Sequence, residues 1–378
     1  MTERPDAAAD VLVVGGGPAG LAAATELARR DRQVTVVDRG HDGVDVTMVF
    51  TPRAVAASRR VGIDIAEHSH PIERIRLTAV SPDGVAGSST STGWPRVRTA
   101  PDPGTVGSRH TFVERLRELA TELGVRFVDG DAERPIVERG FVRGAVVRTP
   151  DGRHERIHGR FTVVADGGNS QFGRLLGTFR QPDWPIAVAH AADLASPLHL
   201  AGEIEIVLGL TDRAGTPISG YGWMFPSGRG TVGVGVMLMS SSPSFQVLNP
   251  AHVHARFVES QAARWQLDSA SMATSMATAT GGRIPMGTSV GPLAGPTYVI
   301  IGDAGAAANP LTGLGLATAL ETGVMAGDVV GEALDQDSGA ALQSYPKLID
   351  DRYGSYYKVG RLTDRIAAQP AVARRLHA

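Results

Sequence analysis

A glycine-rich turn near the start of this 378-residue chain restricts its fold more than any other feature. A short apolar run, Val11–Val14, precedes the turn, in which Gly15, Gly17 and Gly20 follow the spacing G-x-G-x-x-G. A helical pattern then continues to Arg30. The short apolar run predicts a buried strand. Strand, tight turn and helix in this order predict the first half of a βαβ unit, from which dinucleotide-binding α/β domains are built.

The acid that completes such a unit follows at the end of the next β-branched run, Gln33–Val37, where Asp38 stands. In a dinucleotide-binding turn the glycines let a pyrophosphate approach the backbone, and an acid about 20 residues further on binds ribose hydroxyls. Because the chain has 46 glycines, chance would supply roughly 0.7 such matches, so the position between strand and helix is the informative part. The carboxylate of Asp38 would repel a 2′-phosphate, which favours FAD or NAD over NADP as the bound dinucleotide.

Further elements of this domain are spread along the chain. Buried runs at Phe161–Ala165 and Tyr298–Ile301 predict strands, and the patterns at Thr111–Leu123 and Gly313–Leu334 predict helices. Between residues 182 and 281 the pattern changes to alternating strands and turns. The predicted fold class is therefore α/β, with a discontinuous Rossmann-like domain and an inserted, largely antiparallel β-sheet substrate domain. The predicted boundaries are 8–80, 107–180 and 281–378 for the Rossmann-like domain, and 81–106 and 181–280 for the insert.

Composition excludes several other classes of protein. The absence of cysteine rules out disulfides, thiolate metal sites, cysteine nucleophiles and a cysteinyl-flavin bond. A formal net charge of -2 argues against non-specific nucleic-acid binding. The polar start, Met1–Asp10, and the lack of an apolar run of about 18 residues predict a cytoplasmic protein without a membrane-spanning helix. No metal site is predicted, because His252 and His254 follow a helix start and would point to different faces.

Two later segments carry a family resemblance. Ala165–Ser170, with Arg174, contains an Asp-Gly pair at a strand end, and Gly302–Gly315 contains a Gly-Asp pair followed by Asn-Pro-Leu-Thr-Gly-Leu-Gly. With the glycine turn, these segments occur in the order seen in flavoprotein hydroxylases and reductases. The chain resembles the geranylgeranyl reductase family of FAD-dependent oxidoreductases, which has the p-hydroxybenzoate hydroxylase fold. Thr51–Val55 and Gly220–Pro226 also resemble segments of the reductases rather than those of the aromatic hydroxylases.

The resemblance implies a noncovalently bound FAD, with NAD(P)H as a transient electron donor that binds near the Asp-Gly segment. Asp303, at a strand end, can accept hydrogen bonds from ribityl hydroxyls. A helix that starts near Gly313 would direct its positive end at the ligand, worth on the order of 1 kcal/mol for an anionic reduced flavin. The predicted cofactor-binding residues are Gly15, Gly17, Pro18, Ala19, Gly20, Asp38, Arg39, Arg109, Ala132, Asp166, Gly167, Gly302, Asp303, Pro310, Gly313, Gly315 and Leu316.

The candidate substrate-binding residues are Tyr221, Trp223 and Phe225, which alternate along one predicted strand and so share one face of a sheet. Such a face is either hydrophobic core or the wall of an apolar pocket. The resemblance favours the pocket, and Gly233 and Gly235 in the next strand are expected to leave space beside it. Two departures concern the reactive side of the flavin. The segment 44–50 is shorter than in the family and lacks its cysteine, and Leu314 stands where the family commonly has glutamate.

The predicted function is reduction of a carbon–carbon double bond in a hydrophobic isoprenoid-like or polyketide-like substrate by an FAD-dependent oxidoreductase. Two alternatives stay open: a flavin monooxygenase acting on a hydrophobic natural product, and a non-redox isoprenoid carrier or flavin-as-structure protein on the same fold. No catalytic acid and no oligomeric state are predicted. The basic tail at Arg361–Arg375 is interpreted as a solvated or dimer-contact helix, with peripheral membrane contact as the alternative.

Overall fold

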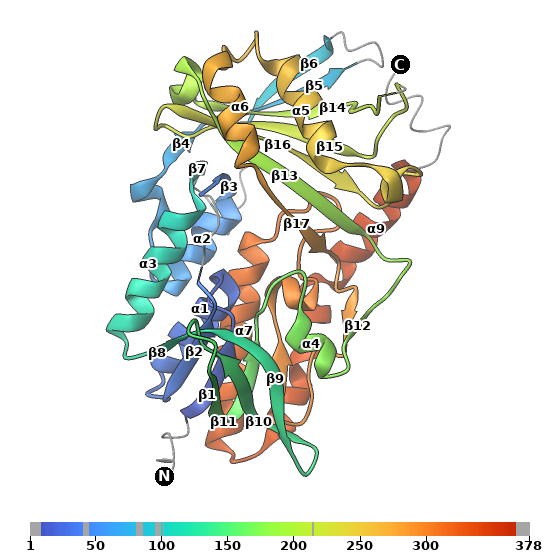
Figure 1. Cartoon of the computed structure of the whole chain (residues 1–378). Coiled ribbons are helices and arrows are strands. Elements are labelled where there is room, and N and C mark those ends of the chain that lie inside the picture. Colours follow the sequence, from blue (N-terminus) through green and yellow to red (C-terminus); the bar gives the residue numbers. More distant parts are fainter. Residues whose placement is uncertain are drawn as a thin grey trace.

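Two seven-stranded sheets, with helices around them, make up most of the protein (Figure 1). This computed structural model describes residues 9–40, 45–80, 86–94, 100, 102–213 and 215–367. The chain starts in the lower sheet of Figure 1, visits the upper sheet at β5 (Arg74–Val80) and β6 (Ala86–Gly93), and returns. It enters the upper sheet again from β13 (Ile186–Ala195) to β17 (Thr280–Pro285). The predicted fold class, a discontinuous α/β domain with a largely antiparallel insert, is confirmed.

The lower sheet has the strand order β8-β2-β1-β11-β10-β9, with β19 paired to β11. The strands β8, β2, β1, β11 and β19 run parallel, whereas β9, β10 and the first half of β11 form an antiparallel meander. Their bounds are β1 (Ala9–Val14), β2 (Val34–Asp38), β8 (Arg126–Asp129), β9 (Asp131–Glu138), β10 (Phe141–Arg148), β11 (His154–Val164) and β19 (Tyr298–Ile300). The predicted strand–turn–helix–strand unit is therefore present at the start of the chain, as the periodicity indicated.

Helices cover the lower sheet and share its main core. Buried apolar residues of α1 and α7, among them Leu21, Leu27, Leu320 and Val324, pack into one cluster. Burying a leucine side chain of this kind is worth about 2 kcal/mol relative to exposure. The helices of this domain are α1 (Pro18–Ala28), α2 (Pro52–Val61), α3 (Arg109–Glu122), α4 (Gln171–Leu175), α7 (Leu316–Asp335), α8 (Tyr345–Ile349) and α9 (Ser355–Ala367), with short helical turns at Ile65–His68, Gly302–Gly305, Gly339–Ser344 and Asp350–Gly354.

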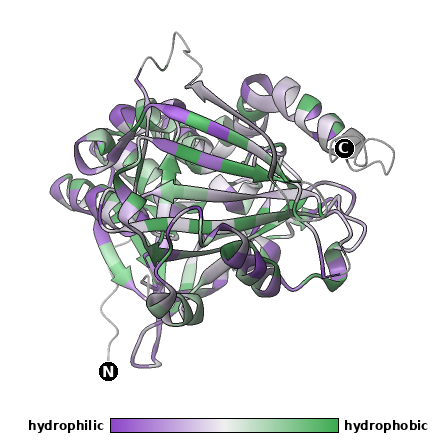
Figure 2. Cartoon of the chain, turned by 90° about the horizontal axis from the view of Figure 1, so that it is seen from above, coloured by the Kyte–Doolittle hydropathy of each residue, from purple (hydrophilic) through white to green (hydrophobic). Residues whose placement is uncertain are grey.

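The upper sheet has the order β17-β13-β16-β15-β14-β5-β6 and is antiparallel except where β14 runs parallel to β5. Green and purple residues alternate along two neighbouring strands of this sheet when the molecule is seen from above (Figure 2). One face packs against α5 and α6 through Val234, Val236 and Phe257. The remaining elements here are β14 (Glu203–Leu208), β15 (Gly220–Pro226), β16 (Thr231–Met239), α5 (Pro250–Gln261), α6 (Ser269–Ala277), and turns at Pro197–Leu200 and Phe245–Val247.

Two element boundaries differ from the sequence prediction. The strand β5 lies in the segment assigned to the Rossmann-like domain, yet it pairs with β14 in the upper sheet. We therefore place the start of the insert near residue 74 and its end near residue 285, since β17 also belongs to this sheet. The helix α7 begins at Leu316 and not at Gly313, because Gly313 adopts a left-handed conformation (φ +66°) that a helix cannot accommodate.

Two smaller sheets connect the domains. The strands β3 (Thr47–Phe50), β7 (Gly104–Ser108) and β4 (His70–Ile72) form a three-stranded antiparallel sheet beneath the upper sheet. A short pair, β12 (Phe179–Arg180) and β18 (Val290–Gly291), lies where the chain crosses between the domains. The Thr51–Val55 segment noted in the sequence therefore follows a strand that the upper sheet covers.

Candidate functional site

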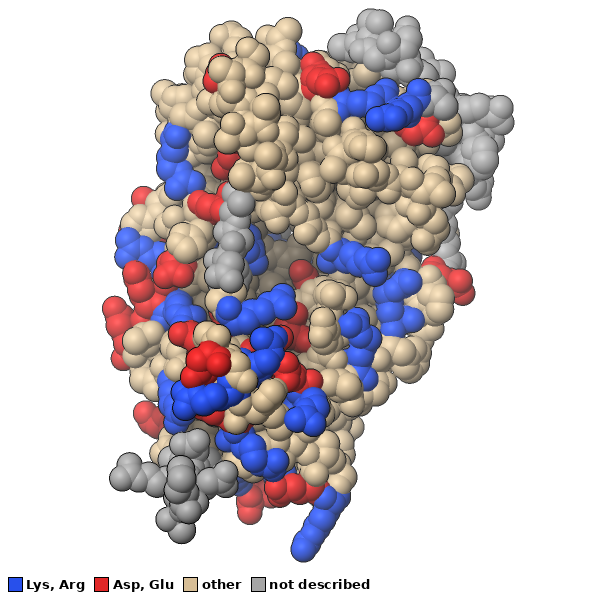
Figure 3. Space-filling view, in the orientation of Figure 1, with Lys and Arg blue, Asp and Glu red and all other residues tan. Residues whose placement is uncertain are grey.

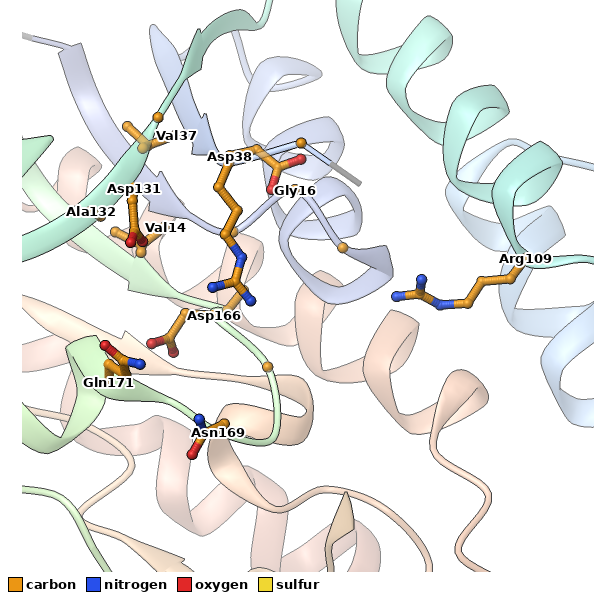
Figure 4. Close-up of a pocket in the computed structure, with 17 residues that line it drawn as sticks. Val14, Gly16, Val37, Asp38, Arg109, Asp131, Ala132, Asp166, Asn169 and Gln171 are labelled. Atoms are coloured by element: carbon orange, nitrogen blue, oxygen red, sulfur yellow. The ribbon is translucent and has the colours of Figure 1, made fainter. Parts of the chain in front are cut away.

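A cavity of about 480 Å³ lies at the carboxyl ends of β1, β2 and β11 (Figure 4). Carboxyl ends of parallel strands are where doubly wound folds bind ligands. Figure 4 shows Arg109 reaching toward it from the start of α3, with Asp166 and Asn169 on the opposite side. Figure 3 shows a hollow between the two domains with basic side chains along its lower rim. Eight of the predicted residues line the cavity: Gly15, Gly17, Asp38, Arg39, Arg109, Ala132, Asp166 and Gly167.

The glycine turn forms the wall of this cavity next to α1. Gly15 has φ +107°, and a Cβ there would lie 2.3 Å from the carbonyl oxygen of Ala165. A Cβ on Gly17, by contrast, would meet no atom within 4 Å, because it would point into open space. Pro18, Ala19 and Gly20 form the first turn of α1 directly behind. The turn thus brings bare backbone to the cavity, as its spacing predicted.

Helices α1, α7 and the five-residue α8 begin without a side-chain cap, and the beginnings of α1 and α7 carry predicted site residues. Helices α2 to α6 each start at a residue whose side chain accepts a backbone N–H of the first turn. The starts of α1 and α7, at Gly17 and Gly315, have no such bond. Uncapped N–H groups and the helix dipole make such an end favourable for an anionic or polar ligand.

Asp38 lies beside the turn with an arginine that sequence reasoning did not find. The Asp38 side chain is 9% exposed, and its Oδ2 is 3.6 Å from Nη1 of Arg117 in α3. The same guanidinium is 3.5 Å from Asp129 and lies 4.1 Å above the ring of Phe127. Arg117 belongs to the helix predicted at 111–123, but only the packing of α3 beside β2 and β8 reveals this contact.

The Asp-Gly segment supplies a carboxylate that is only partly satisfied by the protein. Oδ2 of Asp166 accepts the N–H of Phe172 at 2.9 Å and so holds the first turn of α4. Its Oδ1 is buried and has no hydrogen-bond partner in the part of the chain that the structure describes. Burial raises the pKa of Asp166, although bonds from Ser170 and Phe172 oppose the change. A buried oxygen without a partner costs about 1–3 kcal/mol, so Oδ1 is a position where a ligand donor would be stabilised.

The remaining predicted residues lie next to the cavity, at the start of α7. Gly302 and Asp303 form a helical turn after β19, and a Cβ on Gly315 would lie 3.1 Å from Oδ1 of Asp303. Burial raises the pKa of Asp303, and the positive charge of Arg109 lowers it. Arg109 therefore acts electrostatically on this second group as well as lining the cavity. The group consists of Gly302, Asp303, Pro310, Gly313, Gly315 and Leu316.

The three predicted aromatic residues share the face of the upper sheet that is turned toward the lower domain. Trp223 stacks on Phe225 with ring centroids 5.7 Å apart, and all three side chains belong to one apolar cluster with Met237 and Met286. The hydroxyl of Tyr221 donates to the carbonyl oxygen of Thr312 at 2.5 Å. Burial raises the pKa of Tyr221. This aromatic face therefore lies against the loop that leads into α7.

The space expected at two glycines of β16 is filled. The indole ring of Trp223 lies over Gly235, 2.2 Å from where a Cβ would stand. Thr47 occupies the corresponding position over Gly233, at 2.7 Å. The prediction of open space was wrong. In a closely packed protein, the space that a glycine leaves on a sheet is filled by a neighbouring side chain.

A second polar group missed by the sequence connects α2 and α7. Arg53, in the Thr51–Val55 segment, donates to both oxygens of Glu321 at 2.8 and 2.5 Å. The hydroxyl of Tyr353 also donates to Glu321. Burial alone would raise the pKa of Glu321, but the bonds from Arg53 and Tyr353 outweigh it and lower the pKa. This group fixes the start of α2 to the second turn of α7.

The two histidines of α5 separate, as their spacing predicted. His252 is exposed, whereas His254 is buried, with Nδ1 at 2.9 Å from Nδ1 of His190 and Nε2 at 3.0 Å from the carbonyl oxygen of Val234. Among the described residues no three His, Asp or Glu side chains are grouped so that they could hold a metal ion. In the same residues, no helix combines the length and apolar character needed to cross a membrane.

Comparison with known proteins identifies the family to which this chain belongs. A model of the FAD binding domain matches residues 8–218. The chain belongs to this FAD-binding family. Menaquinone reductase from Mycobacterium tuberculosis is 33% identical over 363 residues, which cover 94% of this chain and 83% of that protein. Digeranylgeranylglycerophospholipid reductase 2 from Methanopyrus kandleri is 27% identical over 382 residues, which cover 95% of this chain and 87% of that protein.

Solved structures agree with this assignment at the level of the fold. A geranylgeranyl bacteriochlorophyll reductase-like protein from Thermoplasma acidophilum has a TM-score of 0.76 at 22% identity, over 96% of this chain and 88% of the other. A flavin-dependent brominase has a TM-score of 0.70 at 15% identity, over 98% of this chain and 92% of the brominase chain. The predicted family is confirmed, and the protein is an FAD-dependent oxidoreductase of the geranylgeranyl reductase and menaquinone reductase type.

Proposed function

We propose that this flavoenzyme reduces a carbon–carbon double bond in a hydrophobic, isoprenoid-like or polyketide-like substrate, with NAD(P)H as the electron donor. The relatives named as menaquinone reductase and digeranylgeranylglycerophospholipid reductase support a reductase acting on such molecules. The observation that carries the proposal is the contact between the aromatic face and the loop before α7, made by the Tyr221–Thr312 bond. It brings an apolar wall to the place where the flavin ring would be held.

The cavity of the lower domain fits the dinucleotide half of FAD. We assign the pyrophosphate to the uncapped start of α1, with Gly15 and Gly17 allowing close approach of the backbone. Asp38 would accept the ribose hydroxyls, while Arg39 and Ala132 would contact the adenosine half. Arg109 would bind the dinucleotide through its guanidinium, as charge-assisted bonds to phosphate are the strong ones. The lower domain is thus the proposed FAD-binding domain.

The flavin half would extend from the Asp-Gly segment toward α7. Oδ1 of Asp166, which has no hydrogen-bond partner among the described residues, and the buried carboxylate of Asp303 are suited to accept hydrogen bonds from ribityl hydroxyls. The uncapped start of α7, with Gly313, Gly315 and Leu316 following Pro310, would face the pyrimidine edge and stabilise negative charge by about 1 kcal/mol. Once bound, FAD supplies the two-electron redox chemistry, and the protein supplies position and electrostatics.

The upper sheet would form the substrate side. Trp223 and Phe225 present apolar surface, and Met237 lies beside them, so this face would exclude water from the reacting double bond. The hydroxyl of Tyr221 donates to Thr312 and keeps the loop in place, so we do not assign it as the proton donor. The spacing G-x-G-x-x-G recurs at Gly228–Gly233, but there it joins the antiparallel strands β15 and β16 and does not lead into a helix, so we do not assign it to a dinucleotide. NAD(P)H is proposed to bind transiently near Asp166–Asn169.

The test combines an absorption spectrum with product analysis. Under anaerobic conditions, NADPH is expected to bleach the flavin band of the purified protein, and a polyisoprenoid quinone or a digeranylgeranyl lipid is expected to restore it. Mass spectrometry should then find a product that has gained two hydrogen atoms and keeps them after air has reoxidised any quinol to the quinone. A product that gains an oxygen atom in air would identify a monooxygenase instead. A band that neither bleaches nor responds to any of these lipids would contradict the redox proposal and favour flavin as structure.

A further inference from the structure

An aspartate of the upper sheet binds the strand that leads into α2. The N–H of Thr47 donates to Oδ1 of Asp193 at 3.0 Å, and its hydroxyl donates to Oδ2 at 2.6 Å. Asp193 pairs with Gly233, which in turn pairs with Phe225, so Asp193 lies on the aromatic face of the sheet. Thr47 is 5% exposed and packs where a side chain on Gly233 would stand. The Thr47–Asp193 contact is therefore a buried connection between the two domains.

The residues just before Thr47 hold the first turn of α3. The carboxylate of Asp45 accepts the hydroxyl of Ser108 at 2.6 Å and the N–H of His110 at 2.9 Å. The carbonyl oxygen of Val46 accepts the N–H of Arg109 at 3.1 Å. Three hydrogen bonds thus fix the backbone on both sides of Arg109 to the segment that Asp193 anchors.

Arg109 connects this arrangement to the cofactor cavity. Its side chain lines the cavity and acts on the charge of Asp303 (Figure 4). Asp193 is not among the described residues that line the cavity. We propose that Asp193 is a positioning residue, which acts through Thr47 and the Asp45–Val46 segment to hold Arg109 in the pose that binds FAD. The inference rests on the proposed function only in that Arg109 binds FAD.

The physical reason is the sensitivity of a guanidinium contact to small displacements. A charge-assisted bond to a phosphate depends on donor direction as well as distance, and a displacement of about 1 Å is enough to impair a positioned group. Without the carboxylate, the N–H and hydroxyl of Thr47 would lose their acceptor, and β3 could move away from the sheet. That movement would be transmitted to the first turn of α3 because the bonds of Asp45 and Val46 join the two.

The experiment is a double-mutant cycle measured as FAD affinity of the full chain after removal of flavin, by quenching of flavin fluorescence. D193A removes both carboxylate oxygens. Asparagine would not serve, because it keeps one acceptor for the N–H of Thr47 and can donate to the Thr47 hydroxyl. D193A should raise the Kd for FAD about fivefold when Arg109 is present, and by less than about twofold in an R109Q background. R109Q alone should raise the Kd about tenfold or more. Such non-additivity between residues that do not touch is the signature of action through Arg109.

Two further variants keep the test decisive. T47V removes only the hydroxyl bond and should give the same pattern with a smaller effect, so it replaces D193A if that variant does not fold. D268A is the matched control, because Asp268 accepts two N–H groups at the start of α6 within the upper domain alone, and replacing such an N-cap by alanine destabilises the helix. It should reduce thermal stability without changing the Kd for FAD.

The proposal is overturned if D193A has the same effect on the Kd in both backgrounds, or none when Arg109 is present. It is also overturned if R109Q leaves the Kd unchanged. These results concern binding alone. Failure of the proposed reduction of a double bond would leave the cycle unaffected, so the two failures can be told apart.

Discussion

At the scale of single residues, the site is defined by what glycine allows and by which carboxylates are left for a ligand. Gly15 and Gly17 belong to one motif, yet their surroundings differ, since only the first is pressed against the end of β11. Asp166 and Asp303 are both buried enough for their pKa values to be raised. Both carboxylates thus lie in surroundings that disfavour their charged form, which is typical of functional sites.

The two glycines should respond differently to alanine. G15A meets both the Ala165 carbonyl and a left-handed backbone, so it should lower the free energy of unfolding by about 2 kcal/mol or more and abolish FAD binding. G17A has open space around it and should leave stability within about 0.5 kcal/mol, while weakening FAD binding because its methyl group enters the cavity. Urea unfolding and FAD titration of the two variants would check this pair. Equal stability of both variants would contradict the assignment.

Replacing Asp303 should change the stability of the FAD-free protein and its affinity for FAD in opposite directions. Burial raises the pKa of Asp303 above that of the unfolded chain, so the charged form at neutral pH opposes folding, and the contribution of Asp303 to the stability of the FAD-free protein becomes more favourable as the pH falls toward this pKa. D303N removes this charge and should stabilise the FAD-free protein by about 1 kcal/mol, while raising the Kd for FAD about tenfold. Denaturant unfolding at pH 7 without FAD measures the first effect. A less stable FAD-free D303N would refute the argument.

At the scale of elements, the two faces of the upper sheet differ in role. One face holds a buried polar group that stabilises the fold, and the other carries the candidate substrate-binding residues. The face toward α5 holds Glu205, which is 1% exposed and is bound by Arg264 at 2.7 Å and by the indole N–H of Trp265 at 2.8 Å. The opposite face carries Tyr221, Trp223 and Phe225. Strand alternation assigns each residue to one of these faces, so a change on the α5 side should affect stability rather than binding.

The histidine pair between β13 and α5 predicts a pH dependence of stability. Burial, with a smaller contribution from His190, lowers the pKa of His254 from 6.5 to about 4. The unfolded chain therefore binds more protons between these values, and stability present above pH 6.5 is lost as the pH falls toward 4, by up to about 3 kcal/mol. In H254Q this pH dependence should be reduced, whereas H252Q, on the exposed side of the same helix, should keep it. Urea unfolding at pH 7 and pH 4.5 tests the difference.

At the scale of the whole molecule, the cofactor cavity lies in the lower domain, and hydrogen bonds through Thr47 and Arg109 connect it to the upper sheet. FAD at 100 times its Kd should raise the free energy of unfolding by about 2.7 kcal/mol. Because Arg109, Thr47 and Asp193 join the cavity to the upper sheet, amide hydrogen exchange in β13 and β16 should slow together with exchange in β1 and β2. Protection limited to the lower sheet would show that the domains respond to FAD independently.

Local patterns in the sequence by themselves determined the strand–turn–helix unit, the positions of Asp38, Asp166 and Asp303, and the alternating aromatic face. These features depend on periodicity, glycine spacing and strand ends, all of which are readable within about 30 residues. Only the tertiary structure decided that Arg117 meets Asp38, that Trp223 fills the space at Gly235, and that Asp193 anchors Thr47 from 146 positions away. The physical reason is that contacts across domains depend on how whole elements pack, and no local spacing encodes that arrangement.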